Sequence, residues 1–452
     1  MAIFKKIRFF FKFTKALFLK HLKIIILGFL IGGLLFFALP KLIVYIPQPK
    51  KTKRIGLVGR YESTDLPKEV LSLLSTGLTR VGEDGLPLPA LAKEWTVSND
   101  GKTYTFILQD NNFWQDGTKV NAKDIKYAFQ DVEQTIIDEK TIQFKLKEAF
   151  SPFPLALSTP VFKENFIGFG PFKVKKLIKK GNFVQKIILI GSGGNITFYF
   201  YPTFEAAENG FRLGEINILE DILKKPFSDK WQPYLKIDSK INKDGYLALF
   251  FNTQSPLLVD KTVRQALTYA IPNKPKNESR AFGPIHPNSW AYNSSVKQYE
   301  FDPKHAKELL AKSNSESDQN TEEMKIKIST TETFLDWAEV IKESWEKNLN
   351  IIAEVEIINE LPADYQVFLG MQKISLDPDQ YAFWHSTRKE NITNFKNPRI
   401  DKLLEDARRI DDLEERREKY FDFQKSLLEE APTAFILYPE VYNISRKPLF
   451  TW

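Results

Sequence analysis

The sequence predicts an α/β protein of two lobes behind an N-terminal transmembrane helix, and three observations carry that prediction. Segments with the alternating pattern of strands and segments with the spacing of helices follow one another along the chain. About 400 residues follow the membrane segment, which exceeds the usual size of one hydrophobic core. The chain also begins with a basic segment that leads into one long apolar run.

The apolar run predicts a transmembrane anchor at residues 24–46. At about 1.5 Å per residue it is long enough to cross a hydrocarbon core of roughly 30 Å. Seven Lys and Arg precede it, and no acidic residue occurs before Glu62. By the positive-inside rule, residues 1–23 form a basic cytoplasmic segment and the remainder is extracytoplasmic. A cleaved signal peptide is the alternative, but the run is long, and Phe36 stands where cleavage after Ala38 needs a small residue.

Charge and cysteine content exclude several classes of protein. The formal net charge of +7 at first suggests nucleic acid, but residues 1–60 hold 13 Lys and Arg and no acid. The remainder has 51 basic and 57 acidic residues, so no nucleic-acid partner is expected. The absence of cysteine excludes disulfides, thiolate metal sites and a lipid-modified cysteine anchor.

The stretch 89–129 gives the clearest local predictions. Thr103 to Leu108 alternates apolar and polar residues, as a strand with one buried face does. Asp116-Gly117 reads as a tight turn. Asn121 is expected to cap a helix, with Asp124 in its first turn and an apolar stripe from Ile125 to Val132.

Three sequence motifs in this stretch also resemble those of a known family. They are Pro-Ala-Leu-Ala-x-Glu-Trp from Pro89, Asp-Gly-Lys-x-Tyr-x-Phe-x-Leu from Asp100, and Asp-Gly-Thr-x-Val-x-Ala-x-Asp-Ile from Asp116. In this order they resemble the extracellular solute-binding proteins of family 5, the dipeptide- and oligopeptide-binding receptors of ABC importers. Gly168-Phe-Gly-Pro, the helix from Val263 and Phe301-Asp-Pro are similar to further phrases of that family.

The resemblance implies the periplasmic-binding-protein-like fold of type II, with a ligand in an interlobe cleft. The domains expected are a tether at 47–54, a first lobe at 55–250 with a reduced accessory subdomain at 76–160, a second lobe at 251–434, and a return to the first lobe at 435–452. The accessory subdomain is expected to be small because fewer residues separate Asp131 from the strand at Thr141 than is usual for the family.

The sequence contains none of the common catalytic motifs, so the protein is not expected to be an enzyme. Neither a cofactor nor a metal is expected. The glycine-rich loop at 191–194 precedes a strand, which favours a hairpin turn over a phosphate site. Asp377-Pro-Asp379 reads as a turn that starts a helix, with paired carboxylates as the alternative.

The resemblance also directs attention to the segment 370–385. In peptide receptors, an Asp in the phrase Gly-Trp-x-x-Asp-Tyr-x-Asp-Pro meets the α-amino group of the peptide. Here Ile374 occupies that position, so either another acid meets the amine or the ligand has none there. The residues expected at the ligand are Tyr61, Trp114, Phe251, Asn252, Ile374, Trp384 and His385. Plain packing is the alternative for each of them.

Three functions follow from these expectations. The first is a membrane-anchored receptor that delivers peptides or similar solutes to the permease subunits of an ABC importer. The second is a sensory or scaffold ectodomain without transport. The third is a secreted hydrolase, which the absence of catalytic motifs disfavours.

Overall fold

The chain divides into two units, Met1–Thr52 and Lys53–Trp452. The computed structural model describes residues 20–22, 26–27, 32–33, 52–223, 227, 229–276, 279–316 and 324–447. Within these ranges no helix combines the length and the apolar character that a membrane crossing requires. Most of the predicted anchor at 24–46 lies outside the described residues.

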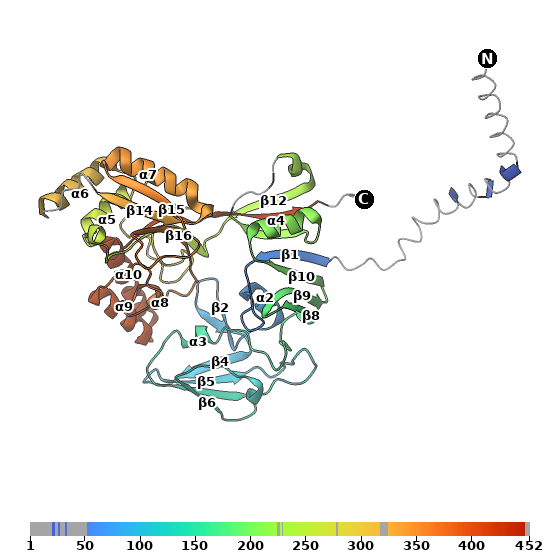
Figure 1. The fold of residues 1–452 in the computed structure, drawn as a ribbon. Helices are drawn as coiled ribbons and strands as arrows, with labels where there is room; N and C mark the ends of the chain where they lie inside the picture. Colours follow the sequence, from blue (N-terminus) through green and yellow to red (C-terminus); the bar gives the residue numbers. More distant parts are fainter. Residues whose placement is uncertain are drawn as a thin grey trace, which may run out of the picture. The chain divides into compact units, whose positions relative to one another are not determined.

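The first lobe is built on a seven-stranded sheet with the spatial order β12–β18–β11–β1–β10–β9–β8 (Figure 1). Its strands are β1 (Thr52–Val58), β8 (Phe172–Lys180), β9 (Phe183–Gly191), β10 (Gly194–Tyr201), β11 (Ile218–Ile222), β12 (Leu235–Ile241) and β18 (Glu440–Arg446). The β9–β10 hairpin predicted around the glycine-rich loop is confirmed. Strand β1 is parallel to β11. Gly59, just after β1, donates to the carbonyl of Tyr201 at the end of β10, so these two strands also run in the same direction.

Helices cover both faces of this sheet, and the alternation along β10 explains why. Phe198 and Phe200 join the core under α2 (Lys68–Leu74), whereas Tyr199 and Tyr201 lie with α4 (Phe204–Leu213). Successive side chains of a strand point to opposite faces, so the two helices lie on opposite sides.

The second lobe is built on a five-stranded sheet with the order β15–β14–β16–β13–β17. Its strands are β13 (Gly245–Phe251), β14 (Lys325–Thr330), β15 (Ile352–Ile357), β16 (Val367–Lys373) and β17 (Thr433–Leu437). All residues of β13 are buried, because one face packs on α5, α6 and α7 and the other on α8, α9 and α10. These helices are α5 (Lys261–Tyr269), α6 (Pro303–Glu316), α7 (Leu335–Leu349), α8 (Tyr381–Trp384), α9 (Pro398–Arg409) and α10 (Leu413–Glu430).

The chain crosses between the two sheets twice, between β12 and β13 and between β17 and β18. The amide of Asn242 in the first crossing donates to the carbonyl of Pro439 in the second at 2.9 Å, so the crossings run side by side. The predicted lobe boundaries at 251 and 435 need correction, because they fall inside β13 and β17, which both belong to the second sheet. An apolar strand pattern shows that a strand is buried and does not show in which sheet.

An accessory subdomain inserted in the first lobe contains a four-stranded antiparallel sheet with the order β4–β5–β7–β6, a β2–β3 hairpin and a short helix (Figure 1). Its elements are β2 (Thr79–Val81), β3 (Pro87–Pro89), β4 (Ala92–Val97), β5 (Thr103–Leu108), β6 (Val132–Ile136), β7 (Thr141–Leu146) and α3 (Phe153–Ala156). The predicted alternation in β5 is confirmed, since Tyr104, Phe106 and Leu108 are buried and the intervening residues are less so.

The predicted helix after Asn121 is wrong beyond its first turn. Asn121 is the N-cap as predicted and also forms a capping box with Asp124, but the helix is a 3₁₀ turn, η1 (Ala122–Asp124). The side chain of Gln134 on β6 then accepts from the amide of Tyr127 and donates to the carbonyl of Ile125. These two backbone groups are therefore satisfied without a helix. The part of the chain that the structure describes also contains the 3₁₀ turns η2 (Asp229–Tyr234), η3 (Pro256–Leu258) and η5 (Glu332–Phe334).

Candidate ligand-binding site

Tyr61 lies on the first lobe, just beyond the carboxyl end of β1. Its ring packs edge-on against Phe200 at 5.2 Å, and its hydroxyl donates to the carbonyl of Val58 at 3.2 Å. Burial raises the pKa of the Tyr61 hydroxyl, and Glu69 and Asp65 add to that effect. Tyr61 is half-buried, so part of its surface remains open to a ligand.

Ile374, Trp384 and His385 all lie on the second lobe, after β16. Ile374 is 7% exposed and Trp384 is 2% exposed, both in the apolar cluster under α9 and α10. The indole nitrogen of Trp384 has no hydrogen-bond partner among the described residues. This buried donor distinguishes Trp384 from an ordinary core residue, because most buried donors are paired.

His385 is buried, and both of its ring nitrogens have a polar partner. Its Nδ1 lies 2.9 Å from the hydroxyl of Thr387, its Nε2 lies 3.2 Å from a carboxylate oxygen of Glu405, and its ring stacks on Tyr381 at 4.2 Å. These contacts match the alternative of a loop histidine with satisfied nitrogens.

The other three expected residues pack in separate cores. Trp114 lies in the core of the accessory subdomain, where its Nε1 donates to Asp124 at 3.3 Å. Phe251 is fully buried in the second lobe. The side-chain amide of Asn252 donates to the carbonyl of Tyr365 at 2.8 Å, and its oxygen accepts from Asn394 at 3.1 Å. The structure therefore does not bring the seven expected residues together in one cavity.

The Asp377-Pro-Asp379 segment is a turn that starts α8. Asp377 accepts from the amide of Asp379, and Asp379 accepts from the amide of Tyr381, each at 3.1 Å. The second oxygen of Asp379 accepts from Nε of Arg408 at 2.9 Å. Burial, with the nearby charge of Asp379, raises the pKa of Asp377 to about 6. The helix-starting turn is thus the correct interpretation of this pair.

Arg408, at the end of α9, lies where the second lobe meets the accessory subdomain. Its guanidinium stacks over the ring of Tyr381 at 4.2 Å and over the ring of Phe150 at 4.9 Å. Nearby, Ser151 donates to the carbonyl of Ile410 at 2.6 Å, and Arg409 pairs with Glu148 at 3.0 Å. We call this contact zone, from 148–151 to 408–411, the seam.

A second contact joins the same two parts. The amide of Trp290 in the second lobe donates to the carbonyl of Asp84 in the β2–β3 turn at 2.8 Å. Gly85 in this turn has φ of 87° and lies so close to Leu376 that an added Cβ would be 2.3 Å from the Leu376 carbonyl oxygen. Glycine is required there on both counts.

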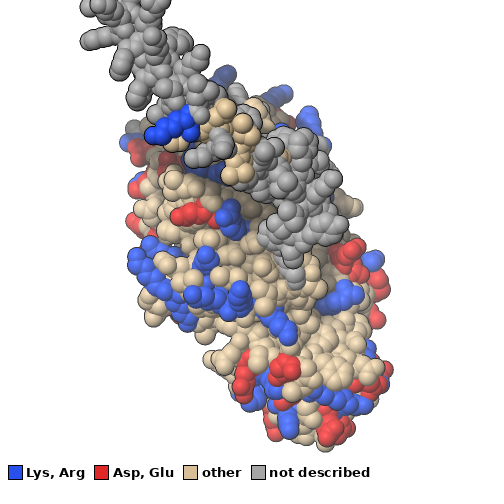
Figure 2. Space-filling model, turned by 90° about the vertical axis from the view of Figure 1, so that its right-hand side faces the viewer, with Lys and Arg blue, Asp and Glu red and all other residues tan. Residues whose placement is uncertain are grey.

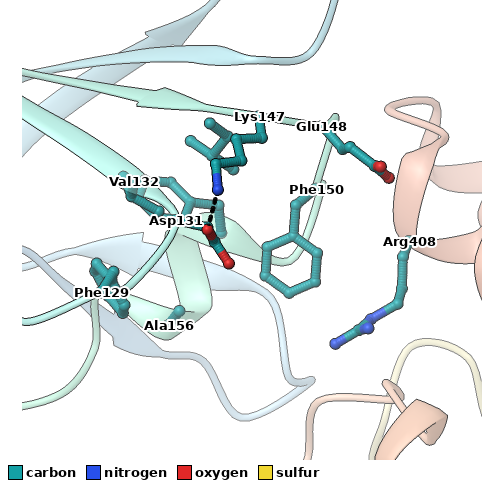
Figure 3. A pocket seen from close by; sticks show the side chains of 10 residues that line it. Phe129, Asp131, Val132, Lys147, Glu148, Phe150, Ala156 and Arg408 are labelled. Carbon is teal, nitrogen blue, oxygen red and sulfur yellow. Dashed lines mark hydrogen bonds and ion pairs between the residues drawn. The ribbon is translucent and has the colours of Figure 1, made fainter. Parts of the chain in front are cut away.

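A pocket of about 400 Å³ opens at the seam (Figure 3). It is lined by Phe129, Asp131, Val132, Leu146, Lys147, Glu148, Phe150, Phe153, Ala156 and Arg408. Its walls are mainly apolar, and its charges are partly paired, because Lys147 pairs with Asp131 and Arg408 with Asp379. Sequence reasoning missed this pocket, because no local pattern connects Arg408 with Phe150. Within the described residues, no group of three or more acidic or histidine side chains is arranged to hold a metal.

Comparisons with known proteins fit this architecture. The family model of bacterial extracellular solute-binding proteins, family 5 Middle, matches residues 87–394, which is more than half of the chain. The dipeptide-binding protein of Escherichia coli K12 is 25% identical over 450 residues, covering 80% of this chain and 82% of its own.

Two solved structures share the fold. AppA from Bacillus subtilis, in complex with a nonapeptide, has a TM-score of 0.65 at 22% identity, covering 90% of this chain and 97% of its own. NikZ from Campylobacter jejuni, in complex with Ni(L-His), has a TM-score of 0.70 at 23% identity, covering 88% and 94%. The resemblance seen in the sequence is thus confirmed, and the chain belongs to the bacterial extracellular solute-binding proteins of family 5.

Proposed function

We propose that this protein is a membrane-anchored receptor that captures peptides or chemically similar solutes and delivers them to an ABC importer. The observation that carries this proposal is the family match over 87–394, which runs from the accessory subdomain through most of the second lobe. The relatives include a dipeptide-binding and an oligopeptide-binding protein, and the solved neighbours include one that holds a nonapeptide.

The ligand would lie between the strand ends of the first lobe and the segment 370–385 of the second lobe. Tyr61 would offer its half-buried ring on the first side, and Ile374, Trp384 and His385, all buried in this structure, would form the second side. Trp114, in the core of the accessory subdomain, and Phe251 and Asn252, in the second lobe, would support the site from behind. The paired crossings at 241–245 and 437–440 would serve as the hinge on which the lobes close.

The ligand's chemistry is constrained by Ile374. An ammonium group buried against this apolar side chain would lack a counter-charge, at a cost of several kcal/mol. We therefore propose a peptide-like ligand whose amino group is blocked, or is held away from Ile374.

The anchor at 24–46 would keep the receptor at the membrane. The sequence supports it through the length of the apolar run and the basic residues before it. The protein has no cysteine, so a lipid on a cysteine side chain cannot provide the attachment.

Native mass spectrometry tests the binding function. All hydrophobic clusters of the described residues lie within Lys53–Trp452, so this ectodomain can be produced without the residues before it. We expect a co-purifying set of peptide-sized masses, and a rise in melting temperature when peptides are added to protein stripped of them. A ligand-free mass together with no thermal shift from peptide libraries would refute the proposal.

A further inference from the structure

The β8–β9 hairpin carries an unbalanced positive charge. Residues 172–191 contain six lysines and no acidic residue. Among the described ion pairs none involves these lysines, and the hydrogen bonds of three of them go to neutral groups. These are Lys173 to the carbonyl of Gln115, Lys179 to Ser63 and Lys186 to Tyr199. Figure 2 shows a basic area at mid-height on this side of the molecule, with few acidic side chains among the basic ones.

One face of the hairpin combines these lysines with isoleucines. The cross-strand pairs Val174–Leu189 and Leu177–Ile187 face the core under α2. Because side chains alternate, the pairs between them lie on the opposite face. These pairs are Lys173–Ile190, Lys176–Ile188 and Ile178–Lys186. We call them the Lys–Ile face.

Among the described residues the Lys–Ile face is at least half open, because Lys173, Lys176 and Ile190 are exposed and its other three residues are half-buried. On this side of the sheet α4 packs on β10 and β11, while the helix that contacts β8, α2, lies on the inner side. Ile190 is 38% exposed, although an isoleucine in a strand usually faces a core. An uncovered surface of alternating basic and apolar side chains suits a partner that is both anionic and apolar.

We propose that the Lys–Ile face binds the surface of a membrane that contains anionic phospholipids. The lysines would meet the phosphate groups while the isoleucines enter the headgroup boundary. Lysines on an edge strand also prevent edge-to-edge pairing. That role accounts for β8, which is the edge strand, but not for Lys186 and the three isoleucines, which lie on the face.

The position of the hairpin in the chain favours a membrane over a soluble polyanion, and this step rests on the proposed anchor. Residues 47–51, between the anchor and β1, span at most about 18 Å when extended. Strand β8 is three strands away from β1, roughly 15 Å. Since β1 and β10 run in the same direction, Lys173 and Ile190 lie at the sheet edge where β1 begins. The short link to the proposed anchor would keep the ectodomain at a membrane, so an anionic bilayer is a partner that is always within its reach.

Co-sedimentation with vesicles tests the proposal on the Lys53–Trp452 ectodomain. The vesicles contain phosphatidylcholine alone, or phosphatidylcholine and phosphatidylglycerol in equal amounts. The test variant carries Lys173→Glu, Lys176→Glu and Lys186→Glu. The control variant carries Lys307→Glu, Lys325→Glu and Lys425→Glu, which make the same change in net charge at exposed lysines elsewhere. A third variant, Ile188→Ser with Ile190→Ser, removes apolar surface alone.

We expect binding to the phosphatidylglycerol vesicles only. Each lysine near an anionic surface strengthens binding about fivefold, so the test variant, which loses three lysines, should bind about a hundredfold more weakly. The control variant should change little. Binding should fall between about 0.1 M and about 1 M NaCl, as the Debye length shrinks from about 10 Å to about 3 Å. The serine variant should keep the preference for phosphatidylglycerol with lower affinity.

Equal loss in the test and control variants, or equal binding to both kinds of vesicle, would overturn the proposal. So would a soluble polyphosphate that binds the ectodomain more tightly than the vesicles do, because the partner would then be a free polyanion. Ligand masses in the native spectrum report the receptor function separately, and they should be the same for the test variant and the unmodified protein.

Discussion

Arg408 is the residue that connects most parts of the seam. Its Nε donates to Asp379 in the turn before α8, and its flat guanidinium lies over Tyr381 and over Phe150 of the accessory subdomain. A guanidinium suits this position because its plane can stack on rings while its edge bonds a carboxylate. One side chain thus connects the turn at Asp379, helix α8 and the accessory subdomain.

Replacing Arg408 by alanine should therefore destabilise the protein by about 1–3 kcal/mol, because a charge-assisted bond and two cation–π contacts are lost and Asp379 is left partly buried. Urea unfolding of both proteins measures the difference. Arg399→Ala on the same helix is the control, since Arg399 is exposed and has no ion pair among the described residues. Equal effects of the two substitutions would show that the contacts of Arg408 contribute nothing.

Asp377 makes a prediction about pH. Its pKa of about 6 in the folded protein exceeds the value of roughly 3.9 expected in the unfolded chain. Below pH of about 4 the group is protonated in both states and has no effect. As the pH rises toward 6 the unfolded chain ionises first, so the folded state loses relative stability, by at most about 3 kcal/mol above pH 6.

Asp377→Asn removes this penalty and keeps an oxygen to accept from the amide of Asp379. The variant should thus be more stable than the unmodified protein above pH 6, and the gain should vanish toward pH of about 4. Urea unfolding between these pH values checks the trend. A gain that does not depend on pH would contradict the raised pKa. Asp379→Asn, which breaks the pair with Arg408, should instead destabilise the protein at neutral pH.

At the scale of elements, the Gly168-Phe-Gly-Pro turn fixes the accessory subdomain to α2 of the first lobe. A Cβ on Gly168 would lie 2.1 Å from the carbonyl oxygen of Leu74, and one on Gly170 would lie 2.4 Å from that of Leu73. The side chain of Gln115 completes this junction, because it donates to the carbonyls of Leu74, Gly170 and Phe172. The glycines that resemble a family phrase thus have a steric reason.

Gly168→Ala should destabilise the protein by about 1–3 kcal/mol, the usual cost of overpacking, because the carbonyl of Leu74 belongs to rigid backbone and must move. Gly193→Ala is the matched control, since an added Cβ at Gly193 meets no atom within 4 Å. Thermal unfolding of both variants measures the contrast. A Gly168→Ala protein that melts with the control would show that the junction can shift at no cost.

Elements with a strong local pattern were predictable from the sequence. The strand predicted at Thr103–Leu108 is confirmed, because its apolar side chains are buried and the intervening ones are less so. The helix after Asp124 was not predictable, because hydrogen bonds from a side chain of the following strand, β6, decide the outcome. The side chain of Gln134 bonds the carbonyl of Ile125 and the amide of Tyr127, which a helix would have paired with its own backbone. Tyr127 also stacks on Phe129 at 5.5 Å, and side chains two positions apart in a helix do not face each other.

The candidate site was less predictable than the elements, and its residues show why. A tryptophan or phenylalanine after a strand has the same local pattern whether it faces a ligand or a core, and Trp114 and Phe251 pack in cores. The seam joins residues that are far apart in the chain, such as Ser151 and Ile410. No local periodicity carries such a contact, so its residues emerge only when the parts are assembled.

At the scale of the whole ectodomain, two features bear on how a ligand enters. The crossings between the lobes are short and hydrogen-bonded to each other, as Asn242 is to Pro439, which suits a hinge. The seam and the β2–β3 turn meanwhile hold the accessory subdomain against the second lobe through a few polar contacts. If the lobes open on this hinge, the seam is the contact that must break.

A cross-link across the seam tests this motion, and the absence of cysteine makes the chemistry selective. Glu148 and Arg409 are exposed and pair at 3.0 Å, so cysteines at both positions can be joined by a short bis-maleimide. We expect the cross-linked ectodomain to release and take up ligand at least about tenfold more slowly, because the binding-competent open state becomes scarce. Rates are followed by the exchange of co-purified ligand in native mass spectra. The unlinked double-cysteine protein controls for the lost ion pair, which as an exposed contact contributes at most about 1 kcal/mol. Unchanged exchange after cross-linking would show that ligand enters without opening the seam. The hinge motion would then have to separate the first-lobe sheet from the second lobe while the seam stays closed.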